Sequence, residues 1–299
     1  MNPRPSSEKL VFETGDLRFS ALGMGEGPLV LCLHGFPDNL YSFRDQLPAL
    51  AEAGYRAISL SLRGYEPSSI PATGDYSVES IASDVIAVMD QLGCDKAHLI
   101  GHDWGAAVAY TAAAAAPERF ESLITMAVPH PGRFAREGLR IPKQLKNSWY
   151  MGFFNIPWLS DWVVARHDFA FICKLWRDWS PGWTPDAQVL DGVIHGLSQP
   201  GVLGATLGYY RAALSLQALT MSADDAHYPV PVPTLALTGE RDGCIDSEVF
   251  ESLMKPEDFP GGLKLERVSG AGHFLHQERP EVVNELIVKW LLNRHAMLG

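Results

Sequence analysis

The chain has 299 residues, of which 46% are hydrophobic and 20% charged, and this composition is that of an ordinary globular protein. A net charge of −11 argues against nucleic acid or an anionic membrane as a partner. No apolar run near the N-terminus has signal-peptide length, and none approaches the roughly 18–20 residues of a membrane span. The four cysteines are widely scattered, with no C-x-x-C pair, so we expect reduced thiols in a cytoplasmic protein.

Strands and helices alternate through the first 130 residues. We expect strands over residues 10–13, 18–22, 29–33, 56–60, 97–100 and 122–128. We expect helices over residues 38–53, 78–92 and 106–116. This alternation predicts a mostly parallel sheet with helices on both faces. In such sheets the loops at the carboxyl ends of the strands form the binding crevice.

The alternation fails between residues 131 and 228. This segment has no buried-strand run, and it contains six of the eight tryptophans, at positions 149, 158, 162, 176, 179 and 183. We interpret it as a helical cap that lies over the strand ends. Strands over 234–238 and 263–268 and helices around and after them then resume the pattern. We therefore predict an α/β core made of residues 1–130 and 229–299, with a cap at 131–228 inserted between its halves.

The segment Gly101-His102-Asp103-Trp104-Gly105 joins an apolar strand to an alanine-rich helix. Flanking glycines allow a turn sharp enough to expose the central side chain. This is the architecture of the G-x-S-x-G nucleophile elbow, with Asp103 in place of serine. Asp242 and His273 follow two later strands, so the chain order is nucleophile, acid and histidine, which is the order typical of α/β-hydrolases.

An aspartate at this position predicts chemistry at a saturated carbon. A serine would leave an ether that water does not readily cleave, whereas Asp103 would leave an ester. Water can attack the carbonyl carbon of that ester, with His273 as general base and Asp242 orienting the imidazole. The backbone amides of Phe36 and Trp104 are placed to bind the resulting oxyanion. The sequence therefore predicts an enzyme that opens an epoxide or a carbon–halogen bond.

The sequence resembles the α/β-hydrolase superfamily and, within it, the epoxide hydrolases, over nearly the whole chain. The motifs that carry the resemblance are His34-Gly35-Phe36-Pro37, Arg63-Gly64-Tyr65, the 101–105 elbow, Ser148-Trp149-Tyr150, Tyr209-Tyr210-Arg211, Gly239-Glu240-Arg241-Asp242 and Gly270-Ala271-Gly272-His273. In that family the cap supplies two tyrosines, and these match Tyr150 and Tyr210. We expect Phe36, Trp104 and Trp149 to contact the substrate.

The leaving group separates the two reactions. A halide needs only N–H donors, whereas an opened epoxide leaves as an alkoxide and needs an acid such as tyrosine, with a pKa near 10. Tyr150 and Tyr210 therefore favour the epoxide. A haloalkane dehalogenase remains an alternative because of Trp104, since those relatives place an indole beside the nucleophile. They usually have Asn or Glu where this chain has Phe36. A non-catalytic ligand-binding receptor and an esterase are less favoured, because the triad is intact and Asp103 replaces serine.

We therefore predict an epoxide hydrolase that converts an apolar epoxide into a vicinal diol without a cofactor or metal ion. Neither nucleic acid nor a membrane is expected as a partner, and a homodimer is left open. The nearest alternatives for two site residues are Tyr209 in place of Tyr210 and Asp246 in place of Asp242. The tight loop after His34 favours a cis peptide bond between Phe36 and Pro37, although X-Pro bonds are usually trans.

Overall fold

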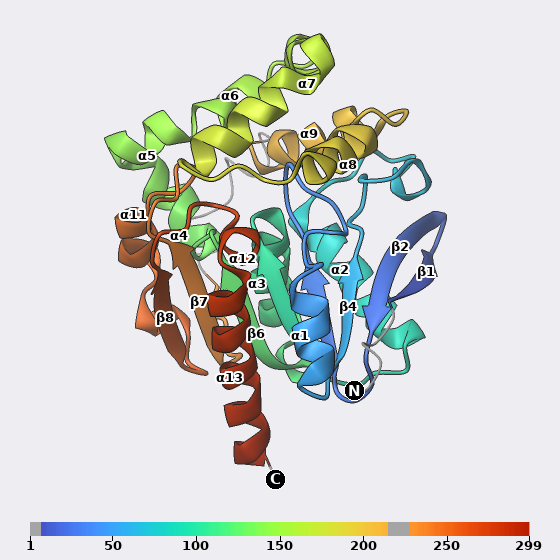
Figure 1. Cartoon of the computed structure of the whole chain (residues 1–299), viewed down its shortest axis with the longest axis vertical. Coiled ribbons are helices and arrows are strands. Elements are labelled where there is room, and N and C mark those ends of the chain that lie inside the picture. Colours follow the sequence, from blue (N-terminus) through green and yellow to red (C-terminus); the bar gives the residue numbers. More distant parts are fainter. Residues whose placement is uncertain (1–6, 215–227, 299) are drawn as a thin grey trace.

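The centre of the molecule is a mixed β-sheet. The computed structural model describes residues 7–214 and 228–298, and within them eight strands lie in the order β1-β2-β4-β3-β5-β6-β7-β8 (Figure 1). They are β1 (Glu8–Thr14), β2 (Leu17–Met24), β3 (Leu29–Leu33), β4 (Arg56–Leu60), β5 (Ala97–His102), β6 (Phe120–Met126), β7 (Thr234–Gly239) and β8 (Leu263–Val268). From β4 to β8 along the sheet neighbouring strands are parallel, whereas β1 and β2 pair antiparallel. The predicted mostly parallel sheet is confirmed.

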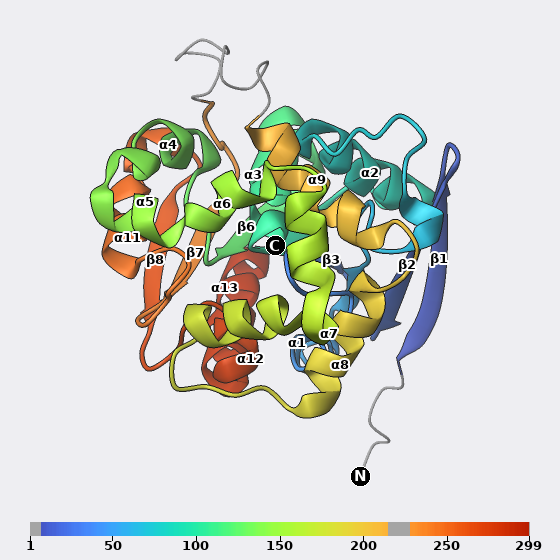
Figure 2. The ribbon, with the colours of Figure 1, turned by 90° about the horizontal axis from the view of Figure 1, so that it is seen from above.

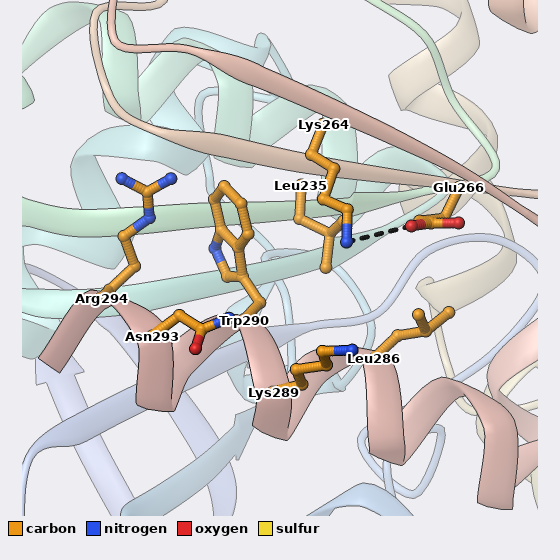
Figure 3. Close-up of a pocket in the computed structure, with 8 residues that line it drawn as sticks. All are labelled: Leu235, Lys264, Glu266, Leu286, Lys289, Trp290, Asn293 and Arg294. Atoms are coloured by element: carbon orange, nitrogen blue, oxygen red, sulfur yellow. Dashed lines mark ion pairs between the residues drawn. The ribbon is translucent and has the colours of Figure 1, made fainter. Parts of the chain in front are cut away.

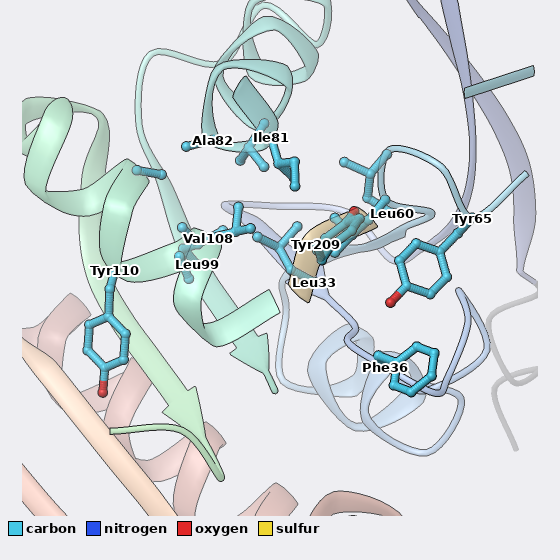
Figure 4. Close-up of a cluster of buried hydrophobic side chains, with 14 of the residues drawn as sticks. Leu33, Phe36, Leu60, Tyr65, Ile81, Ala82, Leu99, Val108, Tyr110 and Tyr209 are labelled. Atoms are coloured by element: carbon cyan, nitrogen blue, oxygen red, sulfur yellow. The ribbon is translucent and has the colours of Figure 1, made fainter. Parts of the chain in front are cut away.

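Helices cover both faces of the sheet, as predicted, and they separate the core into two clusters. The helices outside the cap are α1 (Gln46–Glu52), α2 (Val78–Gln91), α3 (Trp104–Ala115), α11 (Ser247–Leu253), α12 (Leu275–Glu278) and α13 (Pro280–Leu298). Leu29, Leu31 and Leu33 of β3 belong to the buried cluster that also contains side chains of α2 and α3. Figure 4 shows Leu33 in this cluster, with Ile81 of α2 and Val108 of α3. Val30 and Cys32 belong to the cluster with α1 and α13. Burial of each such leucine contributes about 1.5–3 kcal/mol, so both faces hold β3 and the loop that follows it.

The helix predicted over residues 38–53 is too long, because α1 begins only at Gln46. The Asp38 carboxylate accepts hydrogen bonds from the Asn39 N–H at 2.8 Å and the Ser42 hydroxyl at 2.7 Å. Local bonds of this kind stabilise turns in competition with a helix. Residues 38–45 accordingly form successive turns, such as the one closed by the bond from Ser42 N–H to the Asn39 carbonyl.

In the described part of the predicted cap, the regular secondary structure consists of helices, joined by turns and loops. Its helices are α4 (Pro131–Arg136), α5 (Pro142–Asn147), α6 (Trp149–Phe154), α7 (Leu159–Trp179), α8 (Ala187–Leu197) and α9 (Val202–Ala213). Helices α5 to α9 form a layer over the carboxyl ends of the strands, and Figure 2 shows α6, α7 and α9 crossing above the sheet. The end of the predicted cap, residues 215–227, lies outside the described residues.

Short 3₁₀ turns complete the described secondary structure. They are η1 (Pro67–Ser69), η2 (Pro117–Arg119), η3 (Gly138–Arg140) and η4 (Pro256–Asp258). Over residues 7–214 and 228–298 we find no helix whose length and apolar character would let it cross a membrane.

The turn between β5 and α3 is as sharp as the two glycines predicted. Asp103 has φ 52° and ψ −122°, a strained conformation for a residue with a side chain. A Cβ on Gly101 would lie 2.3 Å from the Gly105 carbonyl oxygen, and one on Gly105 would lie 2.0 Å from the Leu33 carbonyl oxygen. These contacts with backbone atoms leave no space for a methyl group. The turn therefore depends on both glycines.

We expect Gly105→Ala to lower the free energy of unfolding by about 3 kcal/mol or more, since even tolerated overpacking costs about 1–3 kcal/mol. Gly196→Ala is the matched control, because a Cβ there meets nothing within 4 Å inside α8. That substitution should raise the free energy of unfolding by about 0.5–1 kcal/mol. Urea denaturation measures both changes. Equal stability of Gly105→Ala and the unsubstituted protein would contradict the close approach.

Candidate active site

Three loops at the carboxyl ends of strands bring Asp103, Asp242 and His273 together. They follow β5, β7 and β8 respectively. The His273 Nδ1 atom lies 3.0 Å from Oδ2 of Asp242, and its Nε2 atom lies 3.6 Å from Oδ2 of Asp103. All three side chains are buried. The Nε2 atom thus lies on the side of the ring that faces Asp103, and Nδ1 on the side that faces Asp242.

The carboxylate that contacts His273 is that of Asp242 and not that of the alternative Asp246. Asp242 Oδ1 accepts hydrogen bonds from the backbone N–H groups of Cys244 at 2.7 Å and Ile245 at 3.0 Å, which leaves Oδ2 for His273. Asp246 instead caps α11 and pairs with Lys143. Two backbone donors therefore fix the carboxylate that orients the imidazole.

The two carboxylates control the charge of His273. Burial by itself lowers the pKa of His273, but the neighbouring Asp242 and Asp103 carboxylates raise it, and the net pKa lies well above the ordinary histidine value. The surroundings of the imidazole therefore favour its cationic form. Loss of the Asp103 charge would remove part of this stabilisation and lower the pKa of His273.

The predicted oxyanion site lies between Phe36 and Trp104. The Phe36 N–H donates to Oδ1 of Asp103 at 2.7 Å. Gly35 lies against the same group, since a Cβ there would be 2.4 Å from Asp103 Oδ1 and 2.6 Å from the Trp104 backbone nitrogen. The peptide bond between Phe36 and Pro37 is cis, as the sequence favoured. One oxygen of Asp103 is thus held by a backbone donor, and the other faces His273.

Tyr150 from α6 and Tyr210 from α9 lie over this group, with ring centroids 5.8 Å apart. The Tyr150 hydroxyl lies 3.1 Å from the Cys244 thiol, and the Tyr210 side chain is buried next to the Trp104 ring. Burial raises the pKa of both phenols well above the ordinary value, so both carry their protons. The neighbouring Tyr209 instead donates its hydroxyl to the Arg63 carbonyl at 2.6 Å.

A cavity of about 200 Å³ joins these groups. It is lined by Asp103, Trp104, Tyr150 and Tyr210 and by the apolar residues Val78, Ala107, Val128, Pro131, Phe134, Ala135, Leu139, Met151, Ala213, Leu214 and Ile245. Sequence reasoning missed these apolar residues, because none of them stands in a motif or carries a charge. Small and aliphatic side chains of this kind favour an apolar ligand.

The structure does not place every predicted residue at the cavity. Trp149 is half exposed, its ring packs against Phe153 and Phe171, and it does not line the cavity, so its contact with substrate stays a prediction. The Phe36 ring is fully buried and does not line the cavity, so only its backbone N–H reaches the site. Trp104 does line the cavity, with its ring 5.0 Å from that of Tyr210.

A larger cavity of about 400 Å³ lies between α13 and the strands β7 and β8 (Figure 3). Its lining residues are Leu235, Lys264, Glu266, Leu286, Lys289, Trp290, Asn293 and Arg294. None of the residues predicted to be catalytic lines it. We therefore assign the candidate active site to the smaller cavity beside Asp103.

One group in the described part of the chain has the ligand types of a metal site, namely Asp242, Cys244 and His273, with atoms within 4.8 Å of one another. Its carboxylate and imidazole already form a hydrogen bond with each other. Burial raises the pKa of the Cys244 thiol, and metals bind the thiolate. The arrangement suits proton transfer better than metal binding.

Two buried histidines stand directly before motif residues. Burial lowers the pKa of His34 to about 4 and that of His102 to about 3. The His102 Nε2 atom lies 2.9 Å from the His273 carbonyl oxygen, and His34 Nε2 accepts the Leu62 N–H at 3.2 Å. Each imidazole therefore makes its hydrogen bond in the neutral form. The His102 ring thereby supports the backbone of the loop that carries His273.

These histidines make stability fall in acid. Because the pKa of His102 is lower in the folded state, the unfolded chain binds a proton that the folded protein does not, from about pH 6.5 down to about 3. In His102→Gln the amide can donate to the same carbonyl but does not titrate. We therefore expect the slope of the free energy of unfolding against pH to be smaller by about 1.4 kcal/mol per pH unit below pH 6. Urea denaturation at pH 6.0, 5.0 and 4.5 measures this slope. The exposed His195→Gln should leave the slope unchanged, and an unchanged slope in His102→Gln would contradict the assignment.

Comparisons with known proteins agree with the fold. A family model described as the alpha/beta hydrolase fold matches residues 28–280, a range that includes the cap and most of both core halves. The chain is 35% identical to epoxide hydrolase 4 of Homo sapiens over 284 residues, which cover 92% of this chain and 76% of that protein. It is 32% identical to epoxide hydrolase 3 of Xenopus tropicalis, with 92% and 75% covered. The crystal structure of a Bacillus megaterium epoxide hydrolase with an inhibitor matches with a TM-score of 0.82 at 27% identity, over 94% of this chain and 99% of that chain.

Proposed function

Because the chain belongs to the α/β-hydrolase fold family, we propose that it is an epoxide hydrolase that adds water to an apolar epoxide to give a vicinal diol. One observation carries the proposal. The Asp103 carboxylate and the buried hydroxyl-bearing side chains of Tyr150 and Tyr210 line the same apolar cavity. An aspartate nucleophile with two phenol acids suits an alkoxide leaving group. The names of the relatives, epoxide hydrolases 3 and 4, support the same reaction.

In the first step, Oδ2 of Asp103 attacks a ring carbon of the epoxide. The bond between that carbon and the ring oxygen breaks, and the oxygen takes a proton from Tyr150 or Tyr210. Oδ1 becomes the carbonyl oxygen of the new ester and keeps its hydrogen bond from the Phe36 N–H. The ester has no charge, so the pKa of His273 falls, and its proton can return to the tyrosinate.

In the second step, neutral His273 removes a proton from a water molecule, which attacks the carboxyl carbon of Asp103. The Phe36 N–H and the Trp104 N–H stabilise the negative charge that develops on Oδ1. The tetrahedral intermediate then expels the diol oxygen, which takes the proton of the newly formed carboxylic acid. Asp103 is again an anion and His273 again a cation, so the cycle consumes one epoxide and one water.

Product analysis tests the proposal against its alternatives. Styrene oxide, an aliphatic epoxide and a bulky epoxide are incubated with the protein, beside haloalkanes in a halide-release assay. We expect diol from at least one epoxide and no halide, and a single turnover in ¹⁸O-water should leave label in Asp103. Halide release without diol would establish a dehalogenase, and tight saturable binding without diol a receptor. The cytoplasmic location and the homodimer stay predictions.

A further inference from the structure

The apolar residues that line the free volume beside Asp103 are unevenly distributed. Most come from the residues after β6, from α4 and η3 and from the end of α9, including Val128, Phe134, Leu139 and Ala213, and the others are Val78, Ala107, Met151 and Ile245. The volume of about 200 Å³ is smaller than the roughly 300–1,000 Å³ typical of sites for drug-sized ligands. A substrate in this site is therefore small, and its apolar body lies toward α4 and the end of α9.

Aromatic rings that do not line the cavity pack against the two tyrosines. The Phe154 ring packs against Tyr150 and Tyr210, with centroids 5.7 Å and 4.9 Å away. The Phe36 ring packs edge-on against Phe154 at 5.6 Å and against Tyr210 at 5.5 Å. Phe36 and Phe154 are both 0% exposed, and neither lines the cavity. We call this pair the aromatic wall.

The Trp179 ring fills the space between Tyr150 and His273. Its ring centroid lies 4.9 Å from that of Tyr150 and 5.0 Å from that of His273. Protein interiors are packed to crystal density, so a group that entered here would have to displace a ring. A ligand held between Asp103 and the tyrosines therefore has room for a substituent on one side only.

Granted the function proposed above, we propose that the enzyme selects terminal epoxides, in which one ring carbon carries the apolar substituent and the other is CH₂. When the epoxide oxygen faces the tyrosines and a ring carbon faces Asp103, trans substituents on the two carbons point in opposite directions. One of them enters the cavity and the other meets the aromatic wall. A terminal epoxide places only hydrogen atoms against the wall, so it fits without displacing Phe36 or Phe154.

The first test compares two isomers of equal size in the unsubstituted enzyme, 1,2-epoxyhexane and trans-3,4-epoxyhexane. We expect kcat/KM for diol formation to favour the terminal isomer about 100-fold, in the range that misplaced methylene groups cost in tight pockets. Similar kcat/KM values for both isomers would overturn this selectivity and leave the proposed function standing. Diol from neither isomer would count against the proposed function itself.

The second test opens the aromatic wall. Phe154→Ala removes a ring that contacts both tyrosines, so we expect the preference for the terminal isomer to fall at least about 10-fold. Phe171→Ala is the matched control, because the Phe171 ring belongs to the same aromatic cluster. Its neighbours are the rings of Trp149, Phe153 and Phe154. The Phe171→Ala enzyme should keep the preference for the terminal isomer. An unchanged preference in folded Phe154→Ala would show that the wall does not select the substrate. If that variant does not fold, Phe154→Leu makes the same comparison with a smaller expected change.

Discussion

Replacing His273 with Gln is expected to slow turnover strongly and to leave the protein esterified at Asp103. Glutamine cannot remove a proton from water, and general-base catalysis contributes about 10²–10⁴-fold to such a step. The first step does not need the imidazole as a base, because Asp103 and the two tyrosines supply the nucleophile and the acid. After one turnover the intact protein should therefore gain the mass of one epoxide, and its steady-state rate should fall about 10³-fold.

Two controls make the measurement specific. His195→Gln, at an exposed position in α8, should keep full turnover and gain no mass. Asp103→Asn should neither turn over nor gain mass, because it lacks the attacking carboxylate. Normal turnover of His273→Gln would refute the role of the imidazole. Loss of turnover without added mass, in a variant that still binds epoxide, would refute the covalent ester.

Much of the core could be predicted because its strands have a simple pattern. The five apolar residues of β3 indicated a strand buried on both faces, and alternate side chains do enter opposite clusters. The start of α1 could not be predicted in the same way. The hydrophobic spacing continues through residues 38–45, but the hydrogen bonds of the Asp38 carboxylate stabilise turns there. Periodicity does not report such local competition.

The triad was accessible to sequence reasoning because Asp103, Asp242 and His273 each stand at the end of a parallel strand, and these ends meet at one edge of the sheet. The cap was harder. Trp149 and Tyr150 are adjacent on α6, yet one is half exposed and the other buried against the site. Successive residues of a helix point about 100° apart, so the rotation of α6 decides which of them reaches the substrate. Only packing of the cap on the core fixes that rotation.

The double variant Tyr150→Phe, Tyr210→Phe is expected to lower kcat/KM for epoxides about 10³–10⁴-fold. Both substitutions keep the buried rings and remove only the hydroxyls, so no acid remains to protonate the alkoxide as the ring opens. Each single variant should cost less than the double variant, because one phenol acid then remains beside Asp103. Steady-state diol formation measures all three variants.

Tyr209→Phe is the control for this series, because Tyr209 is equally buried but donates its hydroxyl to the Arg63 carbonyl. It should lose about 1 kcal/mol of stability and keep its kcat/KM. Displacement of a halide needs no proton, so a dehalogenase would keep its halide release in the double variant, with the Trp104 indole as a donor to the ion. Epoxide opening at the normal rate in the double variant would show that the tyrosines are not the acids. Because an alkoxide is a far stronger base than a halide ion, this one pair of hydroxyls separates the two reactions that an aspartate nucleophile allows.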